Sequence, residues 1–410
     1  MSLFSAFPLS PVLVTRLTAA GIVAPTPIQT EAIPALLAGR DLVGQARTGS
    51  GKTLAYALPL VQACDPRSKG VQALVLVPTR ELAVQVGGVI AGLADRSGLR
   101  VALLYGGRAM GPQQQALARG DQIVVATPGR LLDHLRQGSI SLRQVRYLVL
   151  DEADEMLDRG FGPDVERILA QTPPERQTAL FSATVPDWVR QTAERHLRDP
   201  LTVMVDPDPE DRPAIEQVVY EVREGGKPQA LRTLLGRQAQ GSTIVFGRTK
   251  HRVKRLALQL ADEGYRAAAL QGNMSQVARE RVIADFRAGR VAVLLATNIA
   301  ARGLDLEGVS QIINYELPES AEWFTHRAGR TGRMGRTGRA VTLLEPADLT
   351  QWRQIERVLG QRFPRHTWET GLPIAEVRTT PEARRPAVAG PAHLHAARGG
   401  RRQPERTRQR

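Results

Sequence analysis

Residues 46–53 have the composition of a phosphate-binding loop, because Ala46–Thr53 has the sequence ARTGSGKT. Gly49 and Gly51 allow backbone amides to approach phosphate oxygens, and a helix that starts directly afterwards adds the positive end of its dipole. Lys52 can reach β- and γ-phosphates, and the Thr53 hydroxyl can ligate Mg²⁺. Alanine at the first position departs from the general pattern, which has glycine there. We predict a nucleoside triphosphate site here.

A second motif, Val149–Asp154, has the sequence VLDEAD, an apolar run that ends in acidic residues. A strand that delivers acids at its carboxyl end places Asp151 beside the metal. Glu152 can then orient and deprotonate the attacking water as a general base. An acidic turn can also be an ordinary solvated helix start, but together with Lys52 and Thr53 the motif predicts triphosphate hydrolysis.

Short apolar runs alternate with segments of helical length along the chain. In the first half the predicted strands are Asp41–Gln45, Ala73–Val77, Val101–Tyr105, Gln122–Ala126, Tyr147–Leu150 and Thr178–Phe181. In the second half they are Thr243–Gly247, Arg266–Leu270, Val291–Ala296, Gln311–Tyr315 and Ala340–Leu344. This alternation predicts an α/β protein whose parallel sheets are covered by helices on both faces.

Two composition breaks divide the chain. Residues 206–213 have the sequence DPDPEDRP, which suits neither a helix nor a strand, so we predict a linker over 206–214. It joins a first domain, residues 1–205, to a second, residues 215–370. Residues 371–410 are rich in Pro, Gly, Arg and Ala, which predicts a disordered basic tail. Two domains across a cleft suit a closure driven by ligand.

The charge of the chain favours a polyanionic partner. Fifty-five Lys and Arg against 41 Asp and Glu give a net charge of +14, and residues 378–410 hold nine Arg and two Glu. Such an excess is typical of nucleic-acid binding, although a basic tail can also serve only solubility.

The number of cysteines and the length of the apolar runs indicate the compartment and whether the chain crosses a membrane. Cys64 is the only cysteine, which excludes an internal disulfide and an oxidised secreted scaffold. No apolar run approaches the ~18 residues that cross a bilayer, and the first residues do not form a signal peptide. We therefore expect a soluble intracellular protein without a membrane partner.

The two motifs together resemble those of a known family. Asp151–Asp154 has the sequence DEAD, and with Ala46–Thr53 it resembles the bacterial type of the DEAD-box ATP-dependent RNA helicases. The resemblance covers about residues 4–345. It implies two tandem RecA-like domains, a cytoplasmic protein, ATP and Mg²⁺ as cofactors, and RNA-stimulated ATP hydrolysis. It further implies local unwinding of RNA duplexes or remodelling of RNA–protein complexes.

The resemblance also implies which residues contact the nucleotide. Gly21–Gln29 resembles the Q motif, so Gln29 would pair with the adenine edge and Phe4 would stack on its face. Asp305 would accept hydrogen bonds from the ribose hydroxyls, and at position 298 asparagine replaces the more common aspartate. The implied nucleotide contacts are Phe4, Gln29, Ala46, Arg47, Thr48, Gly49, Ser50, Gly51, Lys52, Thr53 and Asp305.

An arginine-rich segment, His326–Arg333, has the sequence HRAGRTGR. By the resemblance, Arg330 and Arg333 reach the γ-phosphate from the second domain. Arginine fingers of this kind contribute roughly 10³–10⁵-fold in rate. The sequence GRTGR recurs at 335–339, and the first copy is taken as the site because His326 and Arg327 precede it. The implied catalytic residues are Lys52, Asp151, Glu152, Arg330 and Arg333.

Small, hydroxylic and arginine residues match family positions along the RNA groove, as expected of a surface that binds phosphates and 2′-hydroxyls. The implied RNA contacts are Thr79, Arg80, Gly107, Thr127, Arg130, Arg248, Thr249, Gln276, Arg279 and Thr297. The residues implied to couple ATP to RNA are Asp154, Ser182, Thr184 and His326. Single-stranded RNA and short duplexes with weak sequence preference are the expected substrates, and ribosomal or RNA-decay proteins are possible partners.

Two alternative functions stay open from the sequence. One is an ATP-independent RNA clamp or annealing protein with a degenerate ATP site, although Lys52, Asp151, Glu152, Arg330 and Arg333 are all present. The other is a DNA helicase of the same two-domain build. In the favoured mechanism, ATP and RNA both stabilise one closed state, so each raises the affinity for the other.

Overall fold

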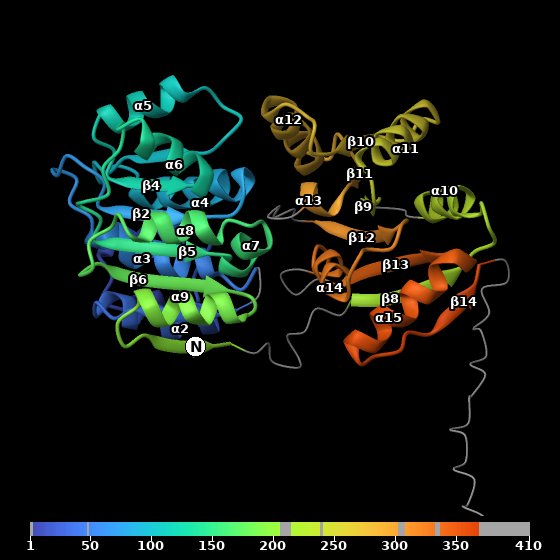
Figure 1. Ribbon diagram of the computed structural model, residues 1–410, viewed down its shortest axis with the longest axis horizontal. Helices are drawn as coiled ribbons and strands as arrows, with labels where there is room; N and C mark the ends of the chain where they lie inside the picture. The colour runs from blue at the N-terminus through green and yellow to red at the C-terminus, as the bar shows by residue number, and fades with distance from the viewer. Residues whose placement is uncertain are drawn as a thin grey trace, which may run out of the picture. The chain divides into compact units, whose positions relative to one another are not determined.

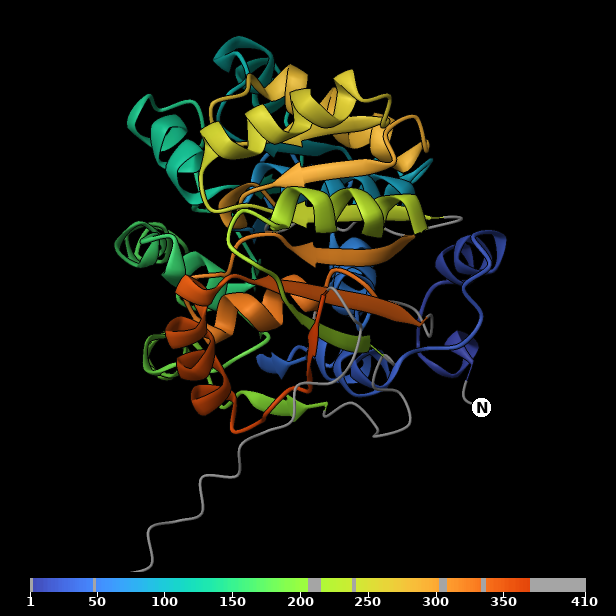
Figure 2. The same cartoon turned by 90° about the vertical axis from the view of Figure 1, so that its right-hand side faces the viewer.

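The computed structural model describes residues 3–46, 49–205, 215–237, 241–301, 308–332 and 337–368. It contains two seven-stranded sheets, one in residues 3–205 (the first lobe) and one in residues 215–368 (the second lobe). Helices cover both faces of each sheet (Figure 1 and Figure 2). The expected α/β class and the two tandem parallel-sheet domains are thus confirmed. The predicted linker and tail lie outside the described residues.

The first sheet has the strand order β3-β4-β2-β5-β6-β1-β7, and every pairing in it is parallel. Its strands are β1 Leu42–Gln45, β2 Ala73–Leu76, β3 Val101–Leu104, β4 Ile123–Ala126, β5 Tyr147–Asp151, β6 Gln177–Ser182 and β7 Leu201–Met204. The strands are short and mostly buried because both faces lie under helices.

Three helices of the first lobe begin at residues that cap them. Ser10 and Thr79 accept backbone N–H groups at the starts of two of them, and Thr26 forms a capping box with Gln29 at a third. The helices of this lobe are η1 Phe4–Ala6, α1 Pro11–Ala19, α2 Pro27–Leu37, α3 Lys52–Ala63, α4 Arg80–Ala94, α5 Met110–Ala118, α6 Pro128–Arg136, α7 Ala153–Asp158, α8 Gly162–Leu169 and α9 Asp187–His196.

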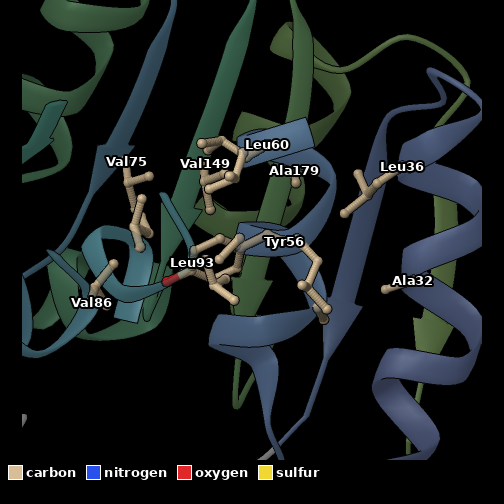
Figure 3. Close-up of a cluster of buried hydrophobic side chains, with 14 of the residues drawn as sticks. Ala32, Leu36, Tyr56, Leu60, Val75, Val86, Leu93, Val149 and Ala179 are labelled. Carbon is tan, nitrogen blue, oxygen red and sulfur yellow. The ribbon is translucent and has the colours of Figure 1, made fainter. Parts of the chain in front are cut away.

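The core of the first lobe lies on the two faces of its sheet. On one face, side chains of α2, α3 and α4 pack against the strands, and Leu36, Tyr56, Val86 and Val149 belong to this cluster (Figure 3). On the other face, α6, α8 and α9 cover the alternate side chains of the same strands. Helix α3 therefore lies directly on the sheet, which fixes the residue at its first turn against the carboxyl ends of the strands.

The second sheet repeats this topology in the order β10-β11-β9-β12-β13-β8-β14, again with parallel pairing throughout. Its strands are β8 Ile215–Glu221, β9 Ser242–Phe246, β10 Ala267–Leu270, β11 Val293–Ala296, β12 Val309–Asn314, β13 Gly338–Leu344 and β14 Arg365–Thr367. Its helices are α10 Lys227–Arg237, α11 Lys250–Asp262, α12 Gln276–Arg287, α13 Asn298–Ala301, α14 Ala321–Ala328, η3 Pro346–Asp348 and α15 Leu349–Leu359.

Every strand predicted from the sequence is present, with ends that differ by one or two residues. Three strands were not predicted: β7, β8 and β14. No helix among the described residues is both long and apolar enough to span a membrane.

Candidate nucleotide and RNA site

The phosphate loop follows β1 and ends at the first turn of α3. Gly49 and Gly51 have φ of +86° and +91°, a left-handed conformation that favours glycine. A Cβ on Gly51 would lie 2.4 Å from the side-chain nitrogen of Gln29. Lys52 begins α3, is buried, and donates from Nζ to the carbonyl of Ala46 at 3.0 Å. Its charge has only a neutral acceptor, so it remains available for an anion.

Gln29 connects the predicted adenine-binding segment to the phosphate loop. Its Nε2 donates to the Gly51 carbonyl at 2.9 Å, and its Oε1 accepts the Thr26 N–H at 3.0 Å. An amide has a second donor and a second acceptor, so pairing with an adenine edge stays possible and stays a prediction. Phe4 is 2% exposed and packs in the hydrophobic core, at 6.0 Å between ring centroids from Phe7. Stacking of Phe4 on an adenine stays a prediction.

The carboxylate of Asp151 lies at the end of β5 in a buried position. Its Oδ2 accepts a hydrogen bond from Tyr56 Oη at 2.8 Å, whereas Oδ1 has no partner among the described residues. Burial raises the pKa of Asp151 to about 6, with Lys52 opposing the rise and Glu152 adding to it. Burial, together with Asp151, also raises the pKa of Tyr56, so this hydroxyl stays a donor. A buried anionic oxygen without a partner is suited to a cation.

Glu152 has an unusual backbone conformation. Its φ of +54° and ψ of 54° place it in the left-handed region, one residue before α7. A non-glycine residue there is strained, and such strain tends to cluster at functional sites. The side chain is 8% exposed, and its Oε2 has no hydrogen-bond partner within the described chain. The carboxylate of Glu152 therefore lies next to Asp151, and its Oε2 has no internal hydrogen bond within the described chain.

Asp154 joins this acidic segment to the end of β6. Its Oδ2 accepts the N–H of Thr184 at 2.8 Å and the Thr184 hydroxyl at 2.9 Å. Its own N–H donates to Ser182 Oγ at 3.1 Å. The predicted contacts among these three coupling residues are therefore present, and a shift of either segment would be transmitted to the other.

The predicted RNA residues of the first lobe follow β2, β3 and β4. Arg80 packs over a double glycine, and a Cβ on Gly107 would lie 2.4 Å from its guanidinium. Thr79 is largely occupied as a helix cap, with its hydroxyl accepting from Leu82 N–H at 3.1 Å. Thr127 is the residue before α6, and Arg130 donates to the carbonyl of Arg108 at 3.1 Å. Because the strands are parallel, these residues share one edge of the sheet with the phosphate loop.

In the second lobe the predicted RNA residues again follow strands. Thr249 caps α11, and the backbone N–H of Arg248 donates to Glu316 at 2.6 Å. Thr297 follows β11 and is partly exposed. Two residues of α12 hydrogen-bond with residues of α4: Gln276 accepts from Arg80 at 3.3 Å, and Arg279 donates to Glu81 at 2.8 Å.

Among the described residues of the arginine-rich segment, Arg327 is the most buried cation, with 2% exposure. Its guanidinium donates to Asn298 Oδ1 at 2.7 Å and to Asn314 Oδ1 at 3.0 Å, and lies 4.8 Å from the ring centre of Phe246. Burial lowers the pKa of Arg327 to about 9. Because guanidinium stays charged in proteins, this shift reflects a cost of burial. Arg327 thus ties Asn298, at the start of α13, to α14 as a structural group.

His326 and Arg330 lie at and just after the end of α14. The His326 ring packs edge-on against Trp323, with 6.0 Å between centroids, and the His326 carbonyl accepts from Arg330 Nε at 3.3 Å. Four other predicted site residues, Arg47, Thr48, Asp305 and Arg333, lie outside the described residues. Their roles stay predictions.

Sequence reasoning missed Tyr56 and Asn314. Tyr56 is four residues after Lys52 on α3, so the two side chains share one helix face, and this spacing was the available signal. Asn314 ends β12 and is fully buried, as an amide that accepts from Arg327 and donates to Thr342 at 3.1 Å. A buried asparagine at the end of a strand is a weaker signal, because nothing local identifies its partner.

Comparison with known proteins assigns the family. The sequence profile of the DEAD/DEAH box helicase family matches residues 26–192, and that of the helicase conserved C-terminal domain matches residues 226–335. The chain therefore belongs to the DEAD-box family of ATP-dependent RNA helicases. Each of the two lobes described above corresponds to one of these profiles.

Individual relatives agree with this assignment. The chain is 42% identical over 363 residues to the ATP-dependent RNA helicase CshA of Listeria monocytogenes, covering 88% of this chain and 70% of that protein. It is 46% identical over 354 residues to the ATP-dependent RNA helicase DeaD of Escherichia coli, covering 86% of this chain and 56% of that longer protein. Among solved structures, Saccharomyces cerevisiae Dbp5 bound to RNA and ADP BeF3 matches with a TM-score of 0.80 and 32% identity, covering 89% of this chain and 96% of the other.

Proposed function

We propose that this chain couples ATP hydrolysis to the local separation of RNA strands or to the remodelling of RNA–protein complexes. The observation that carries the proposal is the acidic pair at the end of β5. Asp151 Oδ1 and Glu152 Oε2 are buried without partners among the described residues, in the lobe that holds the unneutralised Lys52. The two acidic oxygens lack hydrogen-bond partners, and a triphosphate with its cation and water would supply them, which favours turnover over simple clamping.

The residues present fit Mg²⁺. The unpartnered oxygen of Asp151 and the hydroxyl of Thr53 at the first turn of α3 are hard oxygen ligands of the kind that Mg²⁺ uses together with substrate phosphates. No group of three or more His, Cys, Asp or Glu side chains among the described residues forms a metal cage. When bound, Mg²⁺ would neutralise charge on the phosphate oxygens.

The protein's own groups then have separate roles. Lys52 and the amides of the phosphate loop hold the phosphates, with the dipole of α3 aligned toward them. Glu152 orients the attacking water and accepts its proton, which we expect to contribute about 10²–10⁴-fold in rate. Tyr56 donates to Asp151 and so keeps that carboxylate oriented as a positioning residue. Arg330 and Arg333 are proposed to stabilise the charge that develops on the γ-phosphate.

Coupling to RNA is proposed to run through Asp154. Because Asp154 is bonded to Ser182 and Thr184, a movement of the acidic segment on hydrolysis displaces the end of β6. The loops after β2, β3 and β4 lie at the same edge of the sheet and carry the proposed RNA contacts Arg80, Gly107 and Arg130. RNA and ATP then favour the same state and raise each other's affinity.

The test measures ATP hydrolysis with and without a single-stranded RNA, and with DNA of the same sequence as competitor. We expect RNA to raise kcat and DNA to have little effect. Glu152→Gln should lose about 10²–10⁴-fold in kcat yet still bind ATP and RNA. Glu194→Gln removes an exposed carboxylate from α9 and serves as the matched control, with kcat unchanged.

Two results would contradict the proposal. Equal hydrolysis with and without RNA would remove the coupling, and equal stimulation by DNA would favour the DNA helicase alternative. A cytoplasmic location and ribosomal or RNA-decay partners remain further proposals that rest on the family alone.

A further inference from the structure

The first lobe has a hollow away from the candidate nucleotide site. Its volume is about 650 Å³, and its lining residues precede strands: Gln72 precedes β2, Arg146 precedes β5, Arg176 precedes β6 and Arg198 precedes β7. The nucleotide and RNA residues, in contrast, follow strands. Because amino ends of parallel strands meet at one edge, the hollow lies at the sheet edge opposite to the ATP site.

The lining of this hollow is strongly cationic. Arg143, Arg146, Arg176 and Arg198 contribute four positive charges, and Glu175 contributes one negative charge. Within the described ranges, none of the four guanidinium groups has a carboxylate oxygen within 4.0 Å. Many other arginines of the first lobe are paired, as Arg100 is with Asp121 at 3.1 Å and Arg159 with Glu155 at 2.7 Å. The hollow thus carries an excess of positive charge without a close ion pair at any of the four guanidinium groups.

Arg176 is the most informative of the four because it is 94% buried. Its Nη1 donates to the Pro173 carbonyl at 2.9 Å, while Nε and Nη2 have no acceptor among the described residues. The nearby carboxylate of Asp41 is already used by two backbone N–H groups, of Thr178 at 2.8 Å and of Arg198 at 2.6 Å. Burial lowers the pKa of Arg176, and Asp41 only partly offsets this. A buried guanidinium with free donors is costly unless an anion completes it.

The walls of the hollow are held in place by backbone contacts between the segments that form it. The Arg146 N–H donates to the Gln72 carbonyl and the Gln177 N–H donates to the Arg146 carbonyl, both at 2.8 Å. Arg198 Nη2 donates to the carbonyls of Glu175 at 2.9 Å and Arg176 at 3.1 Å. The three segments before β2, β5 and β6 are therefore fixed to one another, and a ligand would meet a preorganised site.

We propose that this hollow binds the phosphate group of a small phosphorylated molecule of about nucleotide size. Guanidinium groups match the geometry of phosphate oxygens and bind them with charge-assisted hydrogen bonds. A terminal phosphate carries up to two negative charges, more than each phosphodiester of a polymer, and therefore suits a hollow with several arginines. The volume lies in the range of small-ligand sites. The site is separate from ATP hydrolysis.

The experiment titrates inorganic pyrophosphate into the full chain by calorimetry. A Lys52→Ala background removes the contribution of the phosphate loop. Arg143→Ala/Arg146→Ala removes two exposed lining arginines and should leave the fold intact. Arg136→Ala/Arg190→Ala removes two exposed arginines elsewhere on the first lobe and is the matched control, since they pair with Asp133 and Asp187.

We expect one saturable pyrophosphate site in the Lys52→Ala background and in the control. The Arg143→Ala/Arg146→Ala variant should bind at least about tenfold more weakly, because it loses charge-assisted contacts. Absence of a saturable site, or an equal loss in the control, would overturn the proposal. So would loss of single-stranded RNA affinity in the lining variant with pyrophosphate binding unchanged, since that would identify the hollow as part of an RNA surface. Basal ATPase of the lining variant in the Lys52 wild-type background should be unchanged.

Discussion

The two lobes share one topology, but the lysines at the equivalent position have different partners. Each strand of the second sheet takes the place of the strand seven earlier in the first. In both lobes a lysine begins the helix after the first strand of the sheet, and Lys52 and Lys227 are each 6% exposed. Lys52 donates a hydrogen bond to the carbonyl of Ala46 and forms no ion pair within 4.0 Å among the described residues, whereas Lys227 forms an ion pair with Asp348 at 2.5 Å.

The loop before Lys227 extends the contrast. Its glycine N–H, at Gly225, donates to Glu345 at 2.9 Å, so two internal carboxylates take the positions that suit an anion. A cavity of about 400 Å³ is present there, lined by Lys227, Glu345 and Asp348 among others. We infer from this difference that the strand–loop–lysine frame does not by itself make a phosphate site. The lysine must also be left without an acidic partner.

The largest expected effect is the difference in ATP hydrolysis between alanine variants of these two lysines. Lys52→Ala should lower kcat/KM for ATP by about 10²–10³-fold, because a fixed charge on the phosphates is lost. Lys227→Ala should leave ATP hydrolysis nearly unchanged but lower the free energy of unfolding by about 1–3 kcal/mol, because Asp348 loses its buried partner. Steady-state kinetics and urea unfolding of both variants measure this. Equal losses of activity would show that the second lysine also contacts nucleotide.

A smaller effect concerns the pH dependence of stability. Burial raises the pKa of Asp151 from 3.8 in the unfolded chain to about 6 in the fold. A raised pKa stabilises the fold at low pH, and this contribution is lost as pH rises through about 6. Asp151→Asn should therefore raise the free energy of unfolding. This increase should be about 1 kcal/mol larger at pH 8 than at pH 5.

Urea unfolding at both pH values measures this gain. Asp348→Asn is the control from the second lobe, and it should destabilise at pH 8 because it removes the partner of Lys227. A gain from Asp151→Asn that did not change with pH would show that the carboxyl is not the titrating group.

The smallest expected effect is a change in stability when Arg327 of the second lobe gains a charged partner. Asn298→Asp gives the buried Arg327 a carboxylate in place of a neutral amide 2.7 Å away. Charge-assisted hydrogen bonds are about twice as strong as neutral ones, so we expect about 0.5–1 kcal/mol of added stability, measured by urea unfolding. Asn314→Asp is the matched control and should not stabilise, because it loses the donor to Thr342. A loss of stability with Asn298→Asp would mean that desolvation of the new carboxylate outweighs the pairing.

Much of the fold and of the site could be predicted because the chemical motifs directly follow apolar strands. The strand before Lys52 and the strand before Asp151 are local features, and parallel topology brings their ends together. The missed strands lack this signal. β7 and β14 are edge strands with few buried residues, and β8, which directly follows the predicted linker, has the sequence IEQVVYE without a continuous apolar run.

Long-range partners were the part that the sequence could not supply. Tyr56 and Asp151 are 95 residues apart, and Lys227 and Asp348 are 121 apart. Their pairing depends on how strands order in the sheet, which no local pattern specifies. For the same reason Lys227 did not stand out, although it occupies the position that Lys52 has in the first lobe.

The left-handed backbone at Glu152 has a consequence for how this chain can change. Glycine adopts a φ of +54° with the least strain, and β-branched residues adopt it with the most. Replacement by glycine would thus relax the backbone while removing the proposed general base. A variant chosen for thermal stability alone would therefore lose turnover at this position, and measuring the stability and kcat of Glu152→Gly together would show the two effects separately.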